Sequence, residues 1–252
     1  MTGTALVPTK DYSIVKRGQQ GIDLLRETLD GQDVNEFSLP RVRIPAGGGL
    51  QWEVPTLSGS EATKELQGVV VMYKSSRSYW SEPYEGDNEP PDCSASDAKH
   101  AVKGDNEIEI PATLDEATNR LLCETCAFSE WGSSDTGSGR GQACKLTRQL
   151  FLIVPDRMLP LVVTLPPTSL KAASAYFLML ADYSKDYRRI TTVVGLEKRS
   201  GKSVPDFSAA TFRMGEDLDD ETAEIMASYS EALRPHFEAV RVESQAEVVD
   251  AS

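Results

Sequence analysis

The feature that most constrains this chain is its set of four cysteines, all within residues 93–144. They are Cys93, Cys123, Cys126 and Cys144. The Cys123-x-x-Cys126 pair has the spacing of a metal knuckle, in which one turn supplies two thiolates and loop closure brings in the others. The surrounding residues 81–142 are polar and rich in turn formers, and strand-like runs flank them. The pattern predicts a β protein with an insertion stapled by a structural Zn²⁺.

The same thiols are compatible with two disulfides or with separate core cysteines. Disulfides need an oxidising compartment. Residues 1–20 hold no apolar stretch of signal-peptide length, so we expect a cytoplasmic protein with reduced thiols. His100 lies in the insertion and is an alternative ligand to Cys93. Catalytic zinc is not expected, because such sites use His or carboxylate ligands and the chain has two histidines.

Charge is distributed unevenly along the chain. The net charge of −13 on its own argues against a nucleic-acid partner. Residues 81–116 and 216–252 each carry eleven acids and two bases, whereas residues 145–213 carry eleven bases and five acids. Because local fields steer a polyanion, the basic centre favours nucleic-acid binding. Acidity that merely keeps the protein in solution is the alternative interpretation.

Hydrophobic alternation predicts five strands and two helices in the central and C-terminal parts. The expected strands are 66–80, 146–154, 159–165, 188–198 and 207–214. A helix is expected after Pro166-Pro167, started by a capping hydroxyl, and another after Asp219 or Asp220. Shorter elements are expected at 22–28, as a helical pattern, and at 37–44 and 50–54, as strands joined by a glycine turn.

The order strand, insertion, strand, strand, helix, strand, strand is that of the OB-fold, a five-stranded barrel. The fold expected is therefore mainly β with α additions: an OB-fold-like five-stranded barrel with a zinc-stapled insertion and a C-terminal helix. A generic mixed α+β sheet is the alternative. The expected organisation is an N-terminal arm (1–35), a core (36–215) that includes the zinc-binding insertion (81–144), and an acidic C-terminal helix with a mobile tail (216–252).

An unpaired nucleic-acid strand is bound by rings on which bases stack and by cations that neutralise phosphates. The candidates at the end of the first long strand are Tyr73, Lys74, Arg77, Tyr79 and Trp80. Further candidates near the knuckle and on later strands are Trp131, Arg140, Lys145, Arg148, Phe151, Arg188 and Lys198. The alternative for the rings is half-buried packing, and for the cations it is a solvated turn or barrel end.

In combination, these features resemble phage single-stranded DNA-binding proteins of the T-even type. That resemblance is carried by the basic, aromatic-lined barrel, the zinc-holding insertion after an early strand, and the acidic C-terminus. The stretch of residues 66–80, then Cys93 … Cys123-x-x-Cys126 … Cys144-Lys145, then LPLVVTLPPTSL (159–170) also looks like a group of uncharacterised phage and mobile-element proteins, a likeness that covers about residues 66–214. The chain departs from the T-even type in having four cysteines rather than a mixed Cys/His set, and in lacking a Lys/Arg-rich N-terminal arm, which puts cooperative binding in doubt.

The resemblance implies a non-enzymatic protein that coats and protects single-stranded DNA, or RNA, in replication or recombination, in the host cytoplasm if the protein is phage-encoded. Replication or recombination proteins would be recruited through the acidic C-terminus. The alternative is a zinc-stapled interaction module acting on replication, transcription or defence proteins. A zinc-dependent hydrolase or nuclease is the third reading, although the sequence carries no nucleophile or nucleotide-binding motif.

Overall fold

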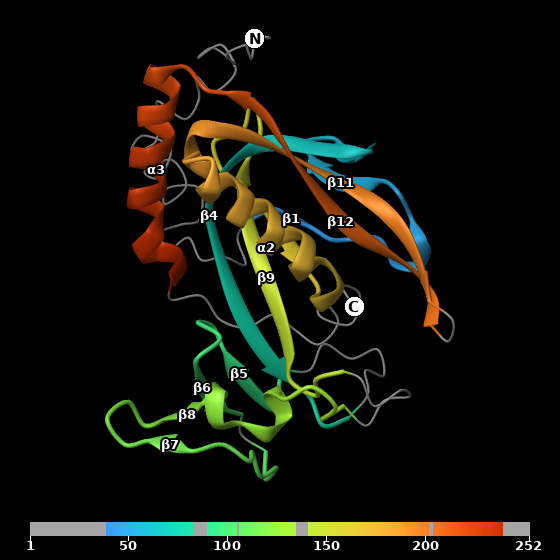
Figure 1. The fold of residues 1–252 in the computed structure, drawn as a ribbon, viewed down its shortest axis with the longest axis vertical. Coiled ribbons are helices and arrows are strands. Elements are labelled where there is room, and N and C mark those ends of the chain that lie inside the picture. The colour runs from blue at the N-terminus through green and yellow to red at the C-terminus, as the bar shows by residue number, and fades with distance from the viewer. Residues whose placement is uncertain (1–38, 83–89, 105, 135–140, 202–203, 239–252) are drawn as a thin grey trace.

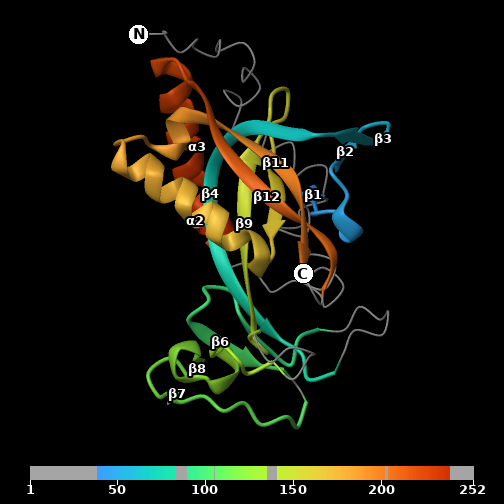
Figure 2. The same ribbon diagram turned by 45° about the vertical axis from the view of Figure 1, so that its right-hand side comes forward.

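The computed structural model describes residues 39–82, 90–104, 106–134, 141–201 and 204–238. This part of the chain is mainly β, with a mixed sheet of many strands and two α-helices. Figures 1 and 2 show a body that contains both helices and a smaller lobe below it, joined by the long strands β4 and β9. The expected N-terminal arm, the C-terminal tail beyond residue 238, and Arg140 lie outside the described residues.

The centre of the body is formed by β4 (Glu65–Tyr79), β9 (Lys145–Ile153) and β10 (Leu161–Leu165), which pair antiparallel. The short strand β1 (Arg41–Val42) adds to β10 in parallel. All five residues of β10 are buried, as are residues 149–153 of β9. A strand covered on both faces has a continuous apolar run instead of an alternating one, and these two strands have that composition.

Separate elements cover the two faces of this sheet. On one face, α3 (Asp220–Glu238) buries Met226 against Val69 and Phe151. Ser230 of α3 also donates a 2.5 Å hydrogen bond to the carbonyl oxygen of Val71, where β4 has a bulge. On the other face lie α2 (Pro167–Asp182) and the hairpin of β11 (Ile190–Gly201) and β12 (Val204–Asp217).

The apolar core between the central sheet, α2 and the β11–β12 hairpin is closed by a tryptophan. This residue comes from a separate hairpin, β2 (Trp52–Thr56) and β3 (Gly59–Thr63). The Trp52 side chain is fully buried and its indole N–H donates to the carbonyl oxygen of Val194 at 3.2 Å. The single-turn helices η4 (Ala46–Gly48) and η7 (Tyr187–Arg189) connect the elements. The glycine turn after β1 falls within η4, where Gly47 has a positive φ of 66°.

The lobe extends the sheet past the end of β4. It contains β5 (Cys93–Ala95), β6 (His100–Lys103), β7 (Leu114–Asp115) and β8 (Arg120–Leu122), followed by η5 (Cys123–Thr125) and η6 (Ala127–Ser129). Cys93, Cys123 and Cys126 pack with Ala101 and Ile110 in a small core of the lobe's own. These short strands were not expected, because runs of two to four residues are too short to show a periodicity.

The expected five-stranded barrel does not form, although its strands and its helix between the third and fourth strands are present. Within the described residues β12 pairs only with β11, and β1 only with β10, so the sheet stays open. The physical reason is that α3 on one face, and α2 with the β11–β12 hairpin on the other, already bury the central strands. Closure of the sheet on itself is therefore not needed to hide its apolar faces.

The two helix starts had different outcomes. Asp219 caps α3 as expected, because its carboxylate accepts the backbone N–H of Thr222 at 2.9 Å. At α2 the expected capping hydroxyl is wrong: the cap position is Pro166, which makes no side-chain hydrogen bond. Ser169 instead accepts the backbone N–H of Ala210 at 2.9 Å, so its hydroxyl joins α2 to β12. Among the described residues, neither helix has the length and apolar character needed to cross a membrane.

Candidate functional site

The four cysteines come together in the lobe, although they start far apart along the chain. All four are buried, none is in a disulfide, and all four line one cavity of about 10 Å³. The backbone N–H of Cys126 donates to the carbonyl oxygen of Cys123 at 3.3 Å, which forms the tight turn of the knuckle. The backbone N–H of Cys144 donates to the carbonyl oxygen of Phe128 at 2.9 Å and brings the fourth thiol to the cavity.

Burial and the neighbouring thiols raise the pKa values of Cys93, Cys123 and Cys144 and so favour their protonated form. Burial raises the pKa of Cys93 to about 12, and the neighbouring Cys144, Cys123 and Cys126 add to the shift. Burial likewise raises the pKa of Cys123 to about 12, partly opposed by Arg77, and it raises the pKa of Cys144. Four sulfurs this crowded repel one another as thiolates unless a cation lies among them.

The donor set fits a tetrathiolate zinc site, and the cavity has about the volume that one water-sized body needs. Within the described residues, however, no three or more His, Cys, Asp or Glu side chains are already arranged as a metal site. The sulfur atoms would therefore move closer together around an ion. The zinc prediction remains a prediction.

His100, the alternative ligand, faces a different space. Its Nδ1 lies 2.7 Å from Oδ2 of Asp97, and its side chain lines a separate pocket of about 370 Å³ with Arg77, Lys99 and Glu124. Cys93 lines the cysteine cavity and His100 does not. The geometry therefore favours the four-cysteine set. Sequence reasoning did not identify Lys99 as a neighbour of Arg77, because the acidic insertion around it carries no basic pattern.

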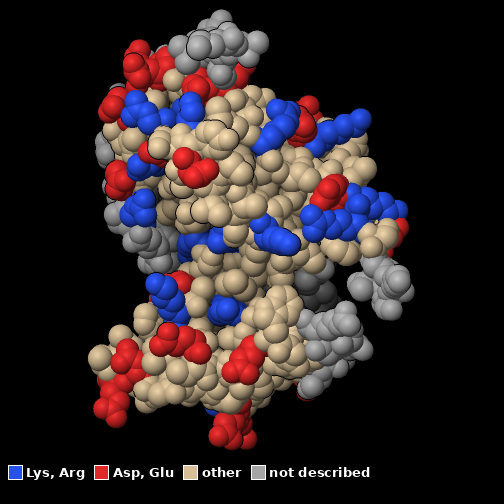
Figure 3. Space-filling model, viewed as in Figure 1, with Lys and Arg blue, Asp and Glu red and all other residues tan. Residues whose placement is uncertain are grey.

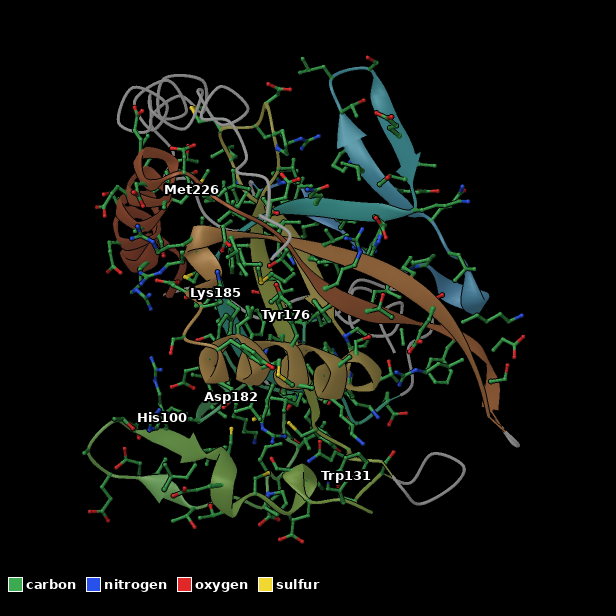
Figure 4. The ribbon with its side chains drawn as sticks, turned by 45° about the horizontal axis from the view of Figure 1, so that its top comes forward. His100, Trp131, Tyr176, Asp182, Lys185 and Met226 are labelled. Atoms are coloured by element: carbon green, nitrogen blue, oxygen red, sulfur yellow. The ribbon has the colours of Figure 1, made fainter. Side chains whose placement is uncertain are left out.

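The predicted stacking rings lie in very different surroundings. Tyr79 stacks on Phe128 with 4.3 Å between ring centroids. Phe151 is fully buried in the core against α3 and offers no face to a base. Trp80 is partly exposed, and Trp131 is 77% exposed. Figure 4 places His100 and Trp131 at opposite ends of the lobe.

Tyr73 is the ring that combines exposure with a nearby cation. It is 38% exposed, stacks on Phe177 of α2 with 4.6 Å between ring centroids, and lies beneath the guanidinium of Arg148 at 5.4 Å. Arg148 also approaches the hydroxyl oxygens of Ser75 at 3.5 Å and Ser174 at 3.4 Å. In the antiparallel register Ser75 faces Arg148, so both belong to one face of the β4–β9 ribbon.

Two other predicted cations are engaged in ion pairs. Arg188 pairs with Asp186 at 2.9 Å and with Glu231 of α3 at 3.0 Å. Lys198 pairs with Asp206 at 2.5 Å. Lys74 and Lys145 are partly exposed on the β4–β9 ribbon. The structure thus brings together Tyr73 and Arg148, whereas Arg188 and Lys198 lie on other elements with their charge offset.

Charge separates visibly between the parts of the molecule. Figure 3 shows Lys and Arg side chains across the narrow waist between the body and the lobe, and Asp and Glu side chains over the lower lobe. We use the name waist face for the surface of the β4–β9 ribbon that carries Tyr73, Ser75, Arg77 and Arg148. A polyanion is attracted to the waist face and repelled by the lower lobe.

A third hollow lies between α2 and β12. It has a volume of about 680 Å³ and is mostly apolar, lined by Tyr176, Met179, Tyr183, Phe212 and Met214 among others. The Tyr176 hydroxyl lies 2.8 Å from Oγ1 of Thr192, which fixes this ring against the hairpin (Figure 4). Met179 and Tyr183 are 57% and 71% exposed, so the apolar surface continues outside the groove.

Comparison of the chain with protein-family models, with curated proteins and with solved structures finds no match. The resemblance to phage single-stranded DNA-binding proteins therefore rests on the sequence pattern alone.

Proposed function

We propose that this protein binds single-stranded nucleic acid, DNA in the first instance, through the waist face. It acts without chemistry on the strand and without strong sequence preference, coating and protecting DNA in replication or recombination as the resemblance to the phage proteins suggests. The observation that carries the proposal is the partly exposed Tyr73 ring beneath the Arg148 guanidinium. A ring and a planar cation together offer one stacking surface and one phosphate contact.

The surroundings of Arg148 support this assignment. Among the described residues no carboxylate lies within ion-pair distance of it, and its nearest polar neighbours are two serine hydroxyls at 3.4 Å or more. A guanidinium without a carboxylate partner can neutralise a phosphate without first breaking an ion pair. Arg188 lacks this freedom because it already bridges Asp186 and Glu231. In the register of the ribbon, Lys74 and Lys145 belong to the opposite face from Tyr73 and Arg148, so they do not extend the waist face. Trp131 on the lobe is the further exposed ring included in the proposal.

A structural Zn²⁺ held by Cys93, Cys123, Cys126 and Cys144 belongs to the same proposal. When bound, the ion would crosslink three segments of the lobe, those that carry Cys93, the Cys123–Cys126 turn and Cys144, and leave no open coordination position for catalysis. The lobe residues around it, Phe128 above all, support the end of β4 through the stacked Tyr79 ring. The metal would therefore hold the lower border of the waist face in place.

The acidic C-terminus is proposed to recruit replication or recombination proteins, with residues 239–252 as the contact. Within α3 part of the acidity is used internally, because Glu224 and Glu231 lie near Arg189 and Arg188. A partner would therefore compete with these ion pairs if it bound the helix itself.

The test is a fluorescence titration with oligo-dT at several salt concentrations, using Trp131 and the other tryptophans as reporters. We expect binding that weakens steeply as salt rises, because released counterions drive it. Arg148→Met should weaken binding by roughly tenfold, about 1.4 kcal/mol. Lys198→Met is the matched control and should bind as the native protein does. A parallel titration with an RNA oligonucleotide measures the preference between the two.

Two results would overturn this function: no binding at low salt, or an equal loss in both variants. The second candidate is then the interaction module, which the apolar groove between α2 and β12 favours. Its occupant would be an apolar segment of a partner protein that buries Met179 and Tyr183. Met179→Asp would abolish capture of that partner and leave oligo-dT binding unchanged, which separates the two functions.

A further inference from the structure

Two buried hydrogen-bond donors beside the cysteine cavity lack a strong acceptor. Within the described residues, Arg77 Nη1 and Ser129 Oγ have no oxygen or nitrogen acceptor, and the group to which both can donate is the thiol of Cys144. Both side chains line the cavity together with the four cysteines. Both also lie next to the sulfur of Cys144. The two donors thus come from different segments, the end of β4 and η6, and converge on one thiol.

Such an arrangement is costly unless something accepts the hydrogen bonds. A buried donor left unpaired costs about 1–3 kcal/mol, and more when it is charged. A neutral thiol is a weak acceptor. A thiolate carries a full negative charge, and hydrogen bonds to an ionised partner are roughly twice as strong as those between neutral groups. The donors therefore suit a cavity whose sulfurs are ionised.

Arg77 also matches the charge of such a cavity. Four thiolates around one divalent ion have a net charge of −2, and the small apolar core of the lobe has no other described cation lining the same cavity. A fixed guanidinium beside the sulfurs offsets half of that charge and is the kind of outer contact that tunes metal affinity. The sequence pattern assigned Arg77 to a nucleic-acid phosphate, but its Nη1 is buried at the lobe's cavity.

We propose that the cysteine cavity binds one Zn²⁺ as a tetrathiolate, with Arg77 and Ser129 donating hydrogen bonds to the sulfur ligands. Binding releases four thiol protons to solvent and takes up one divalent ion. The four sulfurs, neutral as thiols, then have a net charge of −2 together with the ion, and Arg77 reduces this to −1. Arg77 and Ser129 are positioning residues for the metal, and this inference rests on the zinc part of the proposed function.

The experiment uses the full chain and measures zinc content and zinc release to a chromogenic chelator. We expect one zinc per native chain. Arg77→Met keeps the length of the side chain but removes the charge and the donors, and should lower zinc affinity roughly 10- to 100-fold. Ser129→Ala should lower it less. Arg148→Met, a change on the same face of the ribbon, should retain zinc as the native protein does.

A spectroscopic measurement separates a role at the sulfurs from a loss of folding. Co²⁺ exchanged for zinc should give the intense absorption of a tetrahedral four-sulfur site, and the sulfur-to-cobalt bands should shift in Arg77→Met and in Ser129→Ala. Far-ultraviolet circular dichroism checks the fold of each variant. Arg77→Lys should recover part of the zinc affinity because it restores the charge.

Native zinc affinity in Arg77→Met and Ser129→Ala would overturn the inference, as would a native chain that binds no zinc. The nucleic-acid proposal fails separately. If Arg148→Met leaves oligo-dT binding unchanged while Arg77→Met loses zinc, the metal inference stands and the proposed function does not. The reverse pattern, in which Arg148→Met weakens oligo-dT binding and Arg77→Met keeps native zinc affinity, would overturn the metal role of Arg77 and leave the proposed function standing.

Discussion

Asp186 joins the loop after α2 to helix α3 through a single arginine. Its carboxylate accepts the backbone N–H of Arg188 at 2.9 Å and caps η7. The Arg188 side chain pairs with the same carboxylate at 2.9 Å and with Glu231 at 3.0 Å. Burial alone would raise the pKa of Asp186, but the side-chain and backbone hydrogen bonds from Arg188 outweigh it, so the pKa lies below the usual Asp value.

Replacing Asp186 with Asn should therefore destabilise the protein in a pH-dependent way. A carboxyl whose pKa is lower in the folded state stabilises the fold above its unfolded pKa and loses that effect as the pH falls through the folded value. We expect Asp186→Asn to lower the free energy of unfolding by about 1 kcal/mol at pH 7. Urea unfolding of both proteins at neutral and acidic pH measures this change in the free energy of unfolding.

The difference in free energy of unfolding between Asp186→Asn and the native protein should become smaller as the pH falls below the usual pKa of Asp. Asp182→Asn, an exposed carboxyl at the end of α2, is the control and should change little. A difference that stays constant across this pH range would contradict the assignment of the stability to the ionised carboxylate.

Single residues were predicted from sequence only where spacing alone decided the outcome. The Cys123-x-x-Cys126 pair forms one turn as its spacing implied, because a turn is a local matter. That Cys93 and Cys144 line the same cavity depends on the folding of the whole lobe, and the sequence indicated it only through the type of residue. The roles of Tyr79 and Arg77 were not accessible in this way. Whether a ring or a cation at a strand end meets solvent depends on Phe128 and Cys144, which fold back from tens of residues away.

At the scale of elements, β4 exchanges partners at Gly68. Residues 65–68 pair with β11, and from Val69 onward the strand pairs with β9. A Cβ at Gly68 would collide with the backbone carbonyl oxygen of Ile153 on β9. The glycine therefore permits the close approach at which one strand leaves the hairpin and joins the central sheet.

Gly68→Ala should lower the free energy of unfolding by about 2 kcal/mol, because the backbone of β9 must move to accept the methyl group. Gly195→Ala is the matched control on β11. Its Cβ would meet only the hydroxyl of Thr211 at 2.9 Å, and that side chain can rotate away. Thermal unfolding of both variants makes the comparison. Equal effects would show that the close approach at Gly68 is not a source of stability.

Elements with long periodic runs were predicted well. The prediction that the strands close into a barrel was wrong. The strands predicted at residues 159–165 and 188–198 and the helical stripe predicted after Asp219 correspond to β10, β11 and α3. An OB-like order of elements is compatible with both a barrel and an open sheet, and the choice depends on which faces α3 covers. The lobe strands were missed because β7, with two residues, carries too little pattern to detect.

At the scale of the whole molecule, the protein has a body with two apolar cores and a lobe with a third. The β4–β9 ribbon joins them, and Figure 2 shows it as the main connection. Because the clusters share no residues, the body does not need the lobe for its burial. We expect the two parts to unfold separately, with the lobe's backbone amides exchanging hydrogen faster when the metal site is disrupted by Cys126→Ser.

The register of the ribbon has a practical consequence. Ser78 at the end of β4 sits directly opposite Lys145 at the start of β9. Residues 79–144 therefore begin and end at one residue pair of the antiparallel register. A short Asn-Gly turn should be able to replace them and join β4 to β9 as an ordinary hairpin. A shortened chain of this kind, with native-like helical dichroism and cooperative melting, would show that the lobe is a detachable module; an insoluble product would show that the two were never independent.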